Sequence, residues 1–318
     1  MSRHAALLGP TASGKSSIAH AIARDDPSWE LVTVDSMQVY RGMDIGTAKP
    51  SPAERAEVPY HLLDTADPWD DHDLATYQGA AREAVADIAR RGRRALLVGG
   101  TALYLRAVVD DLTLPGRFPA VRADLEAEAD RHGVEPLHAR LAELDPVAAA
   151  RMEPTNRRRV VRALEVTVGS GLPFSSFGPG LDAHPPTSFR LVGLRWDRVE
   201  LDARIAHRYR AQLEAGFLDE VRRLVAGPRP LSRSAGQALG YKELAAHLAG
   251  SCSLDEAVDL AVRRTRRFAR RQDRWFRRDP RIHWVDVTGD PMEALGDVRR
   301  RLDQPASLVR NGPDLVDP

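Results

Sequence analysis

Cysteine is nearly absent from this chain of 318 residues, since Cys252 is the only one. A single thiol excludes an internal disulfide and a zinc site built from cysteines. The sequence contains no run of the ~18 apolar residues that a membrane-spanning helix needs, and the apolar run in MSRHAALLGP is too short for a signal peptide. These absences favour a reducing compartment, and we expect a cytoplasmic protein that does not bind a membrane.

A large net charge is also missing, because 46 Lys and Arg are balanced by 45 Asp and Glu. The positive charge is concentrated locally instead. Residues 263–281 contain ten Arg and two Asp, and residues 151–162 contain five Arg and one Glu. Basic segments of this kind suit a polyanion such as a nucleic acid. The alternative is that both segments are solvated helix faces.

The first half of the chain alternates short apolar runs with helical stretches, which is typical of a parallel α/β sheet. Strands are predicted at 5–8, 31–34, 94–98, 189–194 and 282–287, and helices at 15–24, 74–91, 101–109 and over most of 198–278, with a break at 227–230. Between these parts, the sequence predicts only helices, at 121–132, 136–144, 146–152 and 156–169, followed by a loop at 170–186. We therefore predict a sheet core formed by 1–115 and 187–302, a helical insertion at 116–186 and a disordered tail at 303–318.

The segment GPTASGKS fits the P-loop pattern G-x-x-x-x-G-K-[ST], and it follows a predicted strand and opens a predicted helix. In such a loop, backbone N–H groups and the helix N-terminus bind phosphate oxygens. The lysine neutralises a phosphate, and the final hydroxyl can bind Mg²⁺. We predict a P-loop NTPase-like core that holds a diphosphate-bearing substrate, with Mg²⁺ as cofactor and Ser16 as its ligand. The residues expected to bind the diphosphate are Gly9, Pro10, Thr11, Ala12, Ser13, Gly14, Lys15 and Ser16.

Two further polar residues follow predicted strands of the same sheet. Asp35 comes after LVTV and could be a magnesium carboxylate, a general base, or a cap or turn residue. Thr101 follows two glycines that allow close backbone approach; it could hydrogen-bond a phosphate or a substrate, or cap the next helix. The size of the basic insertion and the second Arg cluster favour a nucleic-acid acceptor.

Six segments, in order along the chain, closely resemble the bacterial type of the tRNA dimethylallyltransferase (tRNA isopentenyltransferase) family. They are GPTASGKS, VDSMQVYRGMDIGTAKP, LLVGGTALY, RRVVRALEV, QALGYKE and ARRQDRW, and with the flanking matches they run from Leu8 to Trp275. The resemblance implies transfer of a dimethylallyl group from dimethylallyl diphosphate to N6 of adenosine 37, in tRNAs reading codons that begin with U. It also implies a P-loop core with an inserted helical domain that grips the anticodon stem-loop. We expect a monomer with no obligate protein partner.

The resemblance also implies roles for individual residues. Asp35 would be the general base, Thr101 would orient Asp35 or the diphosphate, and Lys15 would stabilise the leaving diphosphate. Arg208 is a candidate second cation on the diphosphate, or else an ordinary helix-face arginine. The residues expected to contact tRNA are Asp35, Ser36, Met37, Gln38, Thr101, Arg122, Arg158, Arg159, Val160, Val161, Arg162, Gln237, Ala238, Leu239, Gly240, Tyr241, Lys242, Arg270, Arg271, Gln272, Trp275 and Arg277.

The chain departs from the family pattern at two places, with Arg270 where Lys is common and Arg274 where Thr is usual. Two other classes of function share the P-loop. An ATP-dependent small-molecule kinase could use the same fold, although the basic insertion argues against it. An RNA-binding protein without catalysis would not need Asp35 and Thr101 at strand ends.

Overall fold

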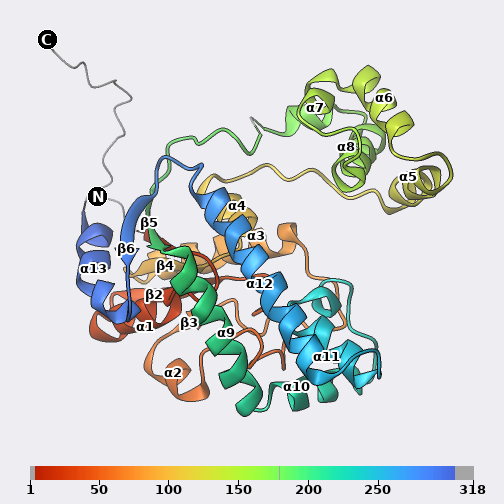
Figure 1. Cartoon of the computed structure of the whole chain (residues 1–318). Helices are drawn as coiled ribbons and strands as arrows, with labels where there is room; N and C mark the ends of the chain where they lie inside the picture. Colours follow the sequence, from red (N-terminus) through yellow and green to blue (C-terminus); the bar gives the residue numbers. More distant parts are fainter. Residues whose placement is uncertain (1–3, 179, 305–318) are drawn as a thin grey trace, which may run out of the picture. The chain divides into compact units, whose positions relative to one another are not determined.

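The computed structural model describes residues 4–178 and 180–304. The chain divides into two compact units (Figure 1). Asp111–Pro185 forms one, called here the inserted unit, and the described residues before and after it, 4–110 and 186–304, form the other, called the core unit. The inserted unit thus begins before the predicted residue 116, because the proline-containing segment that follows Asp111 belongs with the helices after it.

A six-stranded, all-parallel sheet lies at the centre of the core unit, in the order β3-β2-β4-β1-β5-β6. Its strands are β1 His4–Leu8, β2 Trp29–Val34, β3 Tyr60–His61, β4 Arg94–Gly99, β5 Phe189–Trp196 and β6 His283–Val287. The α/β fold and its parallel sheet, predicted from the alternating pattern, are confirmed. Strand β3 was missed because two residues are too few to show an alternating pattern.

Nine α-helices complete the described part of the core unit. They are α1 Lys15–Asp25, α2 Pro52–Glu57, α3 Leu74–Arg90, α4 Ala102–Val109, α9 Arg198–Glu214, α10 Phe217–Val225, α11 Tyr241–Leu248, α12 Leu254–Phe276 and α13 Leu295–Asp303. The predicted tail began two residues too early. Asp303 is the last residue of α13 and accepts hydrogen bonds from Arg94 at 3.2 Å, and Gln304 Oε1 accepts from Arg190 at 3.0 Å. The remainder of that predicted tail, 305–318, lies outside the described residues.

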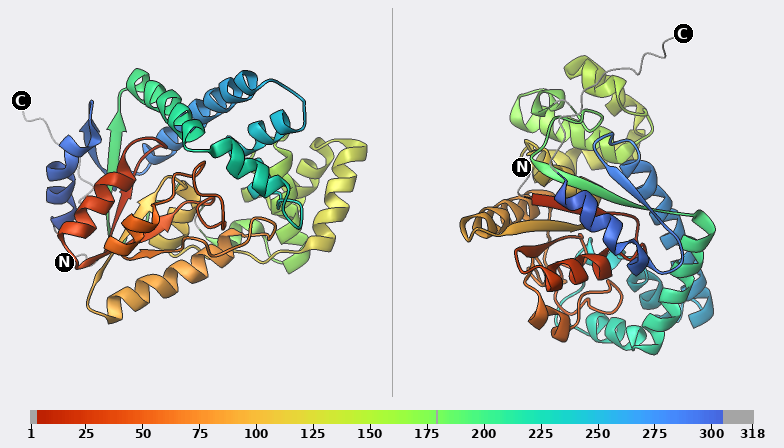
Figure 2. Two further views of the ribbon diagram at one scale, coloured as in Figure 1. Left: turned by 90° about the horizontal axis from the view of Figure 1, so that it is seen from below. Right: turned by 90° about the vertical axis from the view of Figure 1, so that its left-hand side faces the viewer.

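Strand β1 shows that both faces of the sheet are covered. Ala5 and Leu7 belong to an apolar cluster with residues of α1 and α9–α13. Ala6 and Leu8 belong to a second cluster with residues of α3 and α4. Successive side chains of a strand point to opposite faces, and Figure 2 shows helices on both sides of the sheet. A strand buried on both faces is apolar throughout, which is why HAALL carries no polar alternation.

The register of the three central strands sets the position of the loops that follow them. Leu8 of β1 lies opposite Gly99 of β4, and Gly99 lies opposite Val34 of β2. All three strands therefore end at the same level of the sheet. The P-loop, Asp35 and Thr101 leave the sheet from this one edge, where open α/β sheets bind their ligands.

The inserted unit is a small helical bundle with its own core. Its helices are α5 Pro119–His132, α6 Glu135–Leu144, α7 Pro146–Ala150 and α8 Arg157–Ser170. Leu125, Leu137, Leu141 and Leu164 form part of its buried cluster. The Asn156 side chain accepts from the Arg159 N–H at 3.3 Å and caps α8.

Candidate functional site

The P-loop connects β1 to α1 through two residues with positive φ, Ala12 at 65° and Gly14 at 82°. Glycine tolerates this left-handed backbone, and at position 14 it is also required by space. A Cβ atom there would lie 2.3 Å from the Pro291 side chain. Lys15 begins α1, and its Nζ donates to the Pro10 carbonyl at 3.2 Å. The exposed Ser16 follows in the first turn.

Side chains from three other elements hold the P-loop backbone. Trp196 Nε1 of β5 donates to the Ser13 carbonyl at 3.0 Å, and Arg204 Nε of α9 donates to the Ala12 carbonyl at 3.0 Å. Gln272 Oε1 of α12 accepts from the Thr11 N–H at 2.9 Å. The loop is therefore held in its phosphate-binding curvature before any ligand arrives, which reduces the ordering cost of binding.

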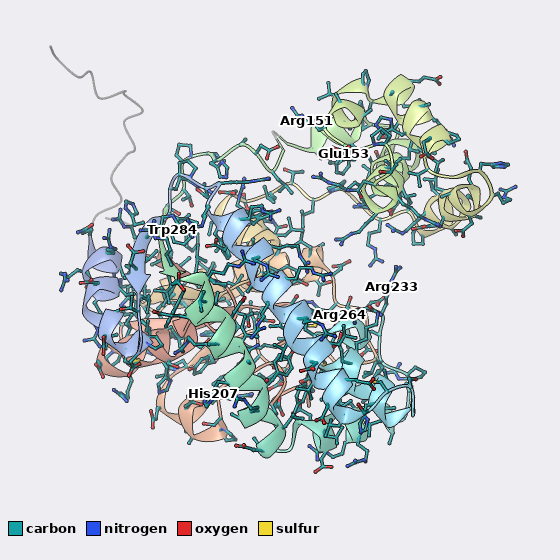
Figure 3. The ribbon with its side chains drawn as sticks, in the orientation of Figure 1. Arg151, Glu153, His207, Arg233, Arg264 and Trp284 are labelled. Carbon is teal, nitrogen blue, oxygen red and sulfur yellow. The ribbon has the colours of Figure 1, made fainter. Side chains whose placement is uncertain are left out.

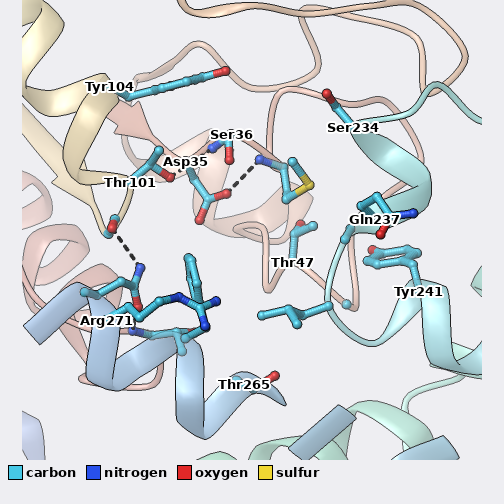
Figure 4. Close-up of a pocket in the computed structure, with 18 of the residues that line it drawn as sticks. Asp35, Ser36, Thr47, Thr101, Tyr104, Ser234, Gln237, Tyr241, Thr265 and Arg271 are labelled. Carbon is cyan, nitrogen blue, oxygen red and sulfur yellow. Dashed lines mark hydrogen bonds between the residues drawn. The ribbon is translucent and has the colours of Figure 1, made fainter. Parts of the chain in front are cut away.

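A cavity of about 440 Å³ opens beside the P-loop. It brings together thirteen of the residues predicted from the sequence, which come from six separate segments: Thr11, Lys15, Asp35, Ser36, Met37, Thr101, Arg208, Gln237, Ala238, Leu239, Tyr241, Arg271 and Gln272. Figure 4 shows Asp35, Thr101, Gln237 and Arg271 around the same hollow.

Sequence reasoning missed other residues of the lining: Gly46, Thr47, His72, Gly100, Tyr104, Tyr209, Ser234, Thr265 and Phe268. Gly46, Thr47, Gly100 and Tyr104 lie inside motif segments quoted above, so their membership of those segments was an available signal. His72, Tyr209 and Phe268 lie in helical or loop sequence with no motif. Burial lowers the pKa of His72, against an opposing effect of Asp73, and its Nδ1 has no hydrogen-bond partner among the described residues.

The backbone N–H groups of Ser36 and Met37 link Thr101 to Asp35. Asp35 Oδ1 accepts from the Met37 N–H at 2.8 Å, and Thr101 Oγ1 accepts from the Ser36 N–H at 3.3 Å. Thr101 occupies the N-cap position of α4, but its side chain makes no capping hydrogen bond. The alternative that the Thr101 side chain only caps this helix is therefore wrong. One oxygen of Asp35 is engaged in a local turn, as the turn alternative proposed. Its carboxylate nevertheless lines the cavity.

The electrostatics of the cavity favour an anion. Burial lowers the pKa of Lys15 to about 8; Asp35 opposes this shift and Arg208 adds to it. Burial likewise lowers the pKa of Arg208. Arg208 donates to Thr11 Oγ1 at 2.8 Å, while its Nε is buried without a partner in the described structure. Two desolvated cations with spare donor capacity would both gain from a bound diphosphate.

Several predicted tRNA contacts on α11 and α12 are used within the protein instead. Gln272 is buried, and its Nε2 donates to the Gly100 carbonyl at 2.7 Å while its Oε1 holds Thr11. Arg277 donates to Asp273 at 2.7 Å, and Arg270 pairs with Asp202 at 3.5 Å. Trp275 packs against an apolar cluster of the core unit. The motif ARRQDRW thus stabilises this part of the fold as well as lining the cavity.

Three more predicted contacts lie outside the cavity lining. Gln38 Nε2 donates to the Thr47 carbonyl at 3.0 Å and shapes the loop that contributes Thr47 to the cavity. Lys242 is exposed and donates to Gln237 at 2.8 Å. Gly240, with φ of 86°, precedes α11 and packs against the ring of Phe217.

In the inserted unit, the predicted tRNA-contacting segment divides into buried, paired and free residues. Val160 and Val161 are fully buried in the core of the unit, so their side chains cannot reach a ligand on the surface. Arg122 and Arg162 both pair with the buried Glu165, at 3.1 and 2.9 Å. Arg158 and Arg159 are exposed, and no described acidic side chain pairs with them.

The described residues contain no group of three or more His, Cys, Asp or Glu that could hold a metal ion. No described helix is long and apolar enough to cross a bilayer. The site is instead a P-loop with two partly buried cations, Lys15 and Arg208, a single carboxylate and a mixed polar and apolar cavity. These features define a P-loop enzyme that binds a phosphate-bearing donor next to an acceptor pocket.

Comparison with known proteins identifies the family. The IPP transferase family model matches residues 38–279, and the isopentenyl transferase model matches residues 2–66. A tRNA dimethylallyltransferase of Streptomyces coelicolor is 49% identical over 300 residues, 93% of this chain and 95% of that protein. Another, of Kineococcus radiotolerans, is 49% identical over 91% of this chain and 92% of that protein. The chain belongs to the tRNA dimethylallyltransferase family, whose members are prenyltransferases acting on tRNA with dimethylallyl diphosphate.

Solved structures agree with this assignment. The crystal structure of the full-length tRNA isopentenylpyrophosphate transferase from Bacillus halodurans matches with a TM-score of 0.67 and 37% identity, over 95% of this chain and 97% of that one. A eukaryotic dimethylallyltransferase acting on tRNA matches with a TM-score of 0.77 at 24% identity, over 94% of this chain and 77% of that one, and shows the shared fold. The small-molecule kinase alternative is not favoured.

Proposed function

We propose that this chain transfers the dimethylallyl group of dimethylallyl diphosphate to N6 of adenosine 37, in tRNAs that read codons beginning with U, and releases diphosphate. One observation carries the proposal. A single cavity joins the cations of the P-loop side to a carboxylate at the end of the neighbouring strand. A donor diphosphate and an acceptor amine would thus have separate partners within one pocket.

Cleavage of the carbon–oxygen bond builds negative charge on the departing diphosphate. Lys15 and Arg208 face the cavity beside Thr11, with the backbone amides of the loop and the N-terminus of α1 nearby. Groups arranged in advance at the site of developing charge stabilise the transition state more than the ground state. The P-loop would here bind a leaving group rather than split a nucleotide.

The acceptor amine of adenine is a weak nucleophile, because its lone pair is delocalised into the ring. As the bond from N6 to the allylic carbon forms and the bond from that carbon to the diphosphate oxygen breaks, one proton must leave N6. Asp35 would accept it through the oxygen that is not engaged by Met37. General base catalysis of this kind contributes roughly 10²–10⁴-fold to the rate.

Mg²⁺ is the proposed cofactor, with the exposed Ser16 hydroxyl at the start of α1 and the donor's own phosphate oxygens as its ligands. Mg²⁺ commonly binds through one or two protein groups together with substrate phosphates and water, so a P-loop hydroxyl without an acidic cluster fits it. When bound, it would add positive charge against the diphosphate.

The proposed acceptor is the anticodon stem-loop of tRNA. The exposed Arg158 and Arg159 of the inserted unit would contact its phosphates. The target base would leave the anticodon stack to enter the pocket, as in other enzymes that modify bases. Its substrate and the single cysteine of the chain lead us to infer a cytoplasmic location.

Radiolabelled dimethylallyl diphosphate, Mg²⁺ and unmodified tRNA test the proposal directly. We expect label in the tRNA without added ATP, and nuclease digestion should place it on adenosine 37. A tRNA with guanosine at position 37 is the matched control and should stay unlabelled. A strict requirement for ATP, or label on a small molecule only, would contradict the proposal.

A further inference from the structure

Helix α10 carries a charged residue on its buried face. Its buried side chains are Phe217, Glu220 and Val221, and this spacing of three and four residues is that of the apolar face of an amphipathic helix. A glutamate is almost never fully buried unless it is paired, yet Glu220 is only 2% exposed. Contacts within the protein must therefore compensate for the lost hydration of its carboxylate.

The partners of Glu220 differ from those of the other buried glutamates. Four glutamates of the described chain are buried, and three of them pair with arginine, as Glu243 of α11 does with Arg264 of α12 (Figure 3). The other two paired residues are Glu30 and Glu165. No described cation pairs with Glu220, and its carboxylate instead accepts from four uncharged donors.

Three of these donors are successive backbone N–H groups. Glu220 Oε2 accepts from the N–H groups of Asp44 and Ile45 at 3.0 and 2.7 Å. Its Oε1 accepts from the Gly46 N–H at 3.2 Å and from the Tyr241 hydroxyl at 2.6 Å. Burial raises the pKa of the Tyr241 hydroxyl and the charge of Glu220 adds to this effect, so the hydroxyl keeps its proton and donates. Successive N–H groups that converge on an anion form a nest, and here the anion is a side chain of the protein itself.

Gln212 of α9 holds the other side of the same backbone, called here the 44–47 segment. Its Nε2 donates to the carbonyls of Ile45 and Gly46 at 2.6 and 3.2 Å. A Cβ at position 46 would lie 2.3 Å from the ring of Phe217, so only a glycine allows this close approach. One side chain thus binds the N–H groups of the segment, and another binds its carbonyls.

The 44–47 segment forms part of the cavity wall. Gly46 and Thr47 line the cavity together with Tyr241, the fourth partner of Glu220, whereas Glu220 itself is not part of the lining. Figure 4 shows Thr47 and Tyr241 around the same hollow as Asp35. A shift of the segment would therefore change the shape of the pocket that contains the proposed base.

We propose that Glu220 is a positioning residue for the transfer reaction, which holds the 44–47 segment and Tyr241 from behind the cavity wall so that the acceptor base and the allylic carbon align. The inference rests on the proposed function for the identity of the reaction. Glu220 acts through the groups that it binds and does not touch a substrate. Because a misplacement of about 1 Å can slow a reaction by about 10²-fold, a residue outside the pocket can control the rate.

The variant Glu220→Gln tests this role. It keeps the shape of the side chain but replaces one oxygen by an NH₂ group, which faces a backbone N–H in either orientation. Glu30→Gln is the matched control, since Glu30 is also buried but lies near the start of β2, away from the loops at the carboxyl ends of the strands. Single-turnover assays measure transfer from dimethylallyl diphosphate to tRNA, and calorimetry measures the Kd of inorganic diphosphate. We expect Glu220→Gln to slow transfer at least about tenfold, with the Kd of diphosphate and the rate of the control within about twofold of the parent protein.

Hydrogen exchange measured by mass spectrometry tests the hold of Glu220 on the segment without the reaction. Hydrogen-bonded amides are protected from exchange, so the amides of 44–46 should exchange faster in Glu220→Gln than in the parent protein, while those of the P-loop should not change. Thermal unfolding establishes that each variant folds. Glu220→Asp is a milder second variant, because it keeps the charge and withdraws the carboxylate by one methylene, and it should give the same pattern at a smaller size.

An equal loss of rate in Glu220→Gln and Glu30→Gln would overturn the positioning role, because it would reflect lower stability alone. Faster exchange of the 44–47 segment with a transfer rate like that of the parent protein would also overturn it, because the place of the segment would not matter to the reaction. If the parent protein itself transferred no label but the exchange difference were present, the proposed reaction would fail and the hold of Glu220 on the segment would stand.

Discussion

The Thr11 N–H in the P-loop donates to Oε1 of Gln272, 261 positions later in the chain, at 2.9 Å. The Nε2 of the same side chain donates to the Gly100 carbonyl at 2.7 Å. A Cβ at position 100 would lie 2.4 Å from that Nε2, so a glycine is needed there. Gln272 therefore fixes the P-loop against the end of β4, one residue before Thr101.

This link predicts the behaviour of Gln272→Ala. One buried and one partly buried hydrogen bond are lost, and a backbone N–H and a backbone carbonyl lose their partners, at up to about 1–3 kcal/mol for each group left unsatisfied. We expect a lower melting temperature, and a Kd for dimethylallyl diphosphate raised about tenfold or more. The salt dependence of tRNA binding should stay as in the parent protein. A flatter slope with unchanged donor affinity would instead make Gln272 a tRNA contact, as the motif alone implied.

Asp35→Asn should reduce the rate of dimethylallyl transfer at least about a hundredfold, because the amide cannot accept the N6 proton. The substitution keeps an acceptor for the Met37 N–H, so the local turn survives. Single-turnover assays near pH 7 would measure the rate of transfer. The affinity of the variant for dimethylallyl diphosphate should differ little from that of the parent protein. A rate close to that of the parent protein would exclude Asp35 as the base.

The lowered pKa of Lys15 predicts that the affinity for dimethylallyl diphosphate depends on pH. Its pKa in the free protein is about 8, lowered by burial, so the free protein loses this charge as the pH rises through 8. A bound diphosphate favours the protonated amine and raises its pKa. Affinity for dimethylallyl diphosphate should therefore fall above pH 8, by up to about tenfold per pH unit, with proton uptake on binding.

Isothermal titration calorimetry at pH 8.5, in two buffers of different ionisation enthalpy, would count the protons taken up. Lys15→Ala should bind the donor more weakly and lose this uptake. The lowered pKa of Lys15 also makes the stability of the ligand-free protein depend on pH. Between pH 8 and 10.5 the unfolded chain keeps the Lys15 proton, whose ordinary pKa is 10.5, while the folded protein has lost it. The free energy of unfolding should therefore rise over this range. Flat affinity across this range would contradict the assignment.

Reversing the charge of Arg158 and Arg159 to Glu should weaken tRNA binding and flatten its salt dependence, and should leave donor affinity unchanged. Both side chains are exposed and lack acidic partners in the described structure. Arg131→Glu with Arg140→Glu is the control. It reverses the same number of charges at exposed residues of the inserted unit that already have partners, the Ala127 carbonyl at 3.3 Å and Glu128 at 3.6 Å. If the slope of log affinity against log salt were the same for both double variants, Arg158 and Arg159 would be solvated residues that do not contact tRNA.

The sequence alone determined the elements whose signals are local. An apolar run, a glycine-rich turn and a helix start predicted β1, the P-loop and α1, because the phosphate-binding geometry is contained in eight consecutive residues. The helical character of the inserted unit followed from periodicity in the same way. Strand β3 was missed because its place depends on pairing with β2, not on its own two residues.

Only the tertiary structure decided which polar side chains are free to act. The sequence places Arg270, Arg271, Gln272 and Arg274 within five residues, but the helix turns them toward different neighbours. Gln272 is buried between two loops, Arg270 meets Asp202, and Arg271 faces the cavity. The partners come from the P-loop, from the residue that follows β4 and from α9, all distant in sequence. A side chain's availability depends on those partners, and local pattern does not contain them.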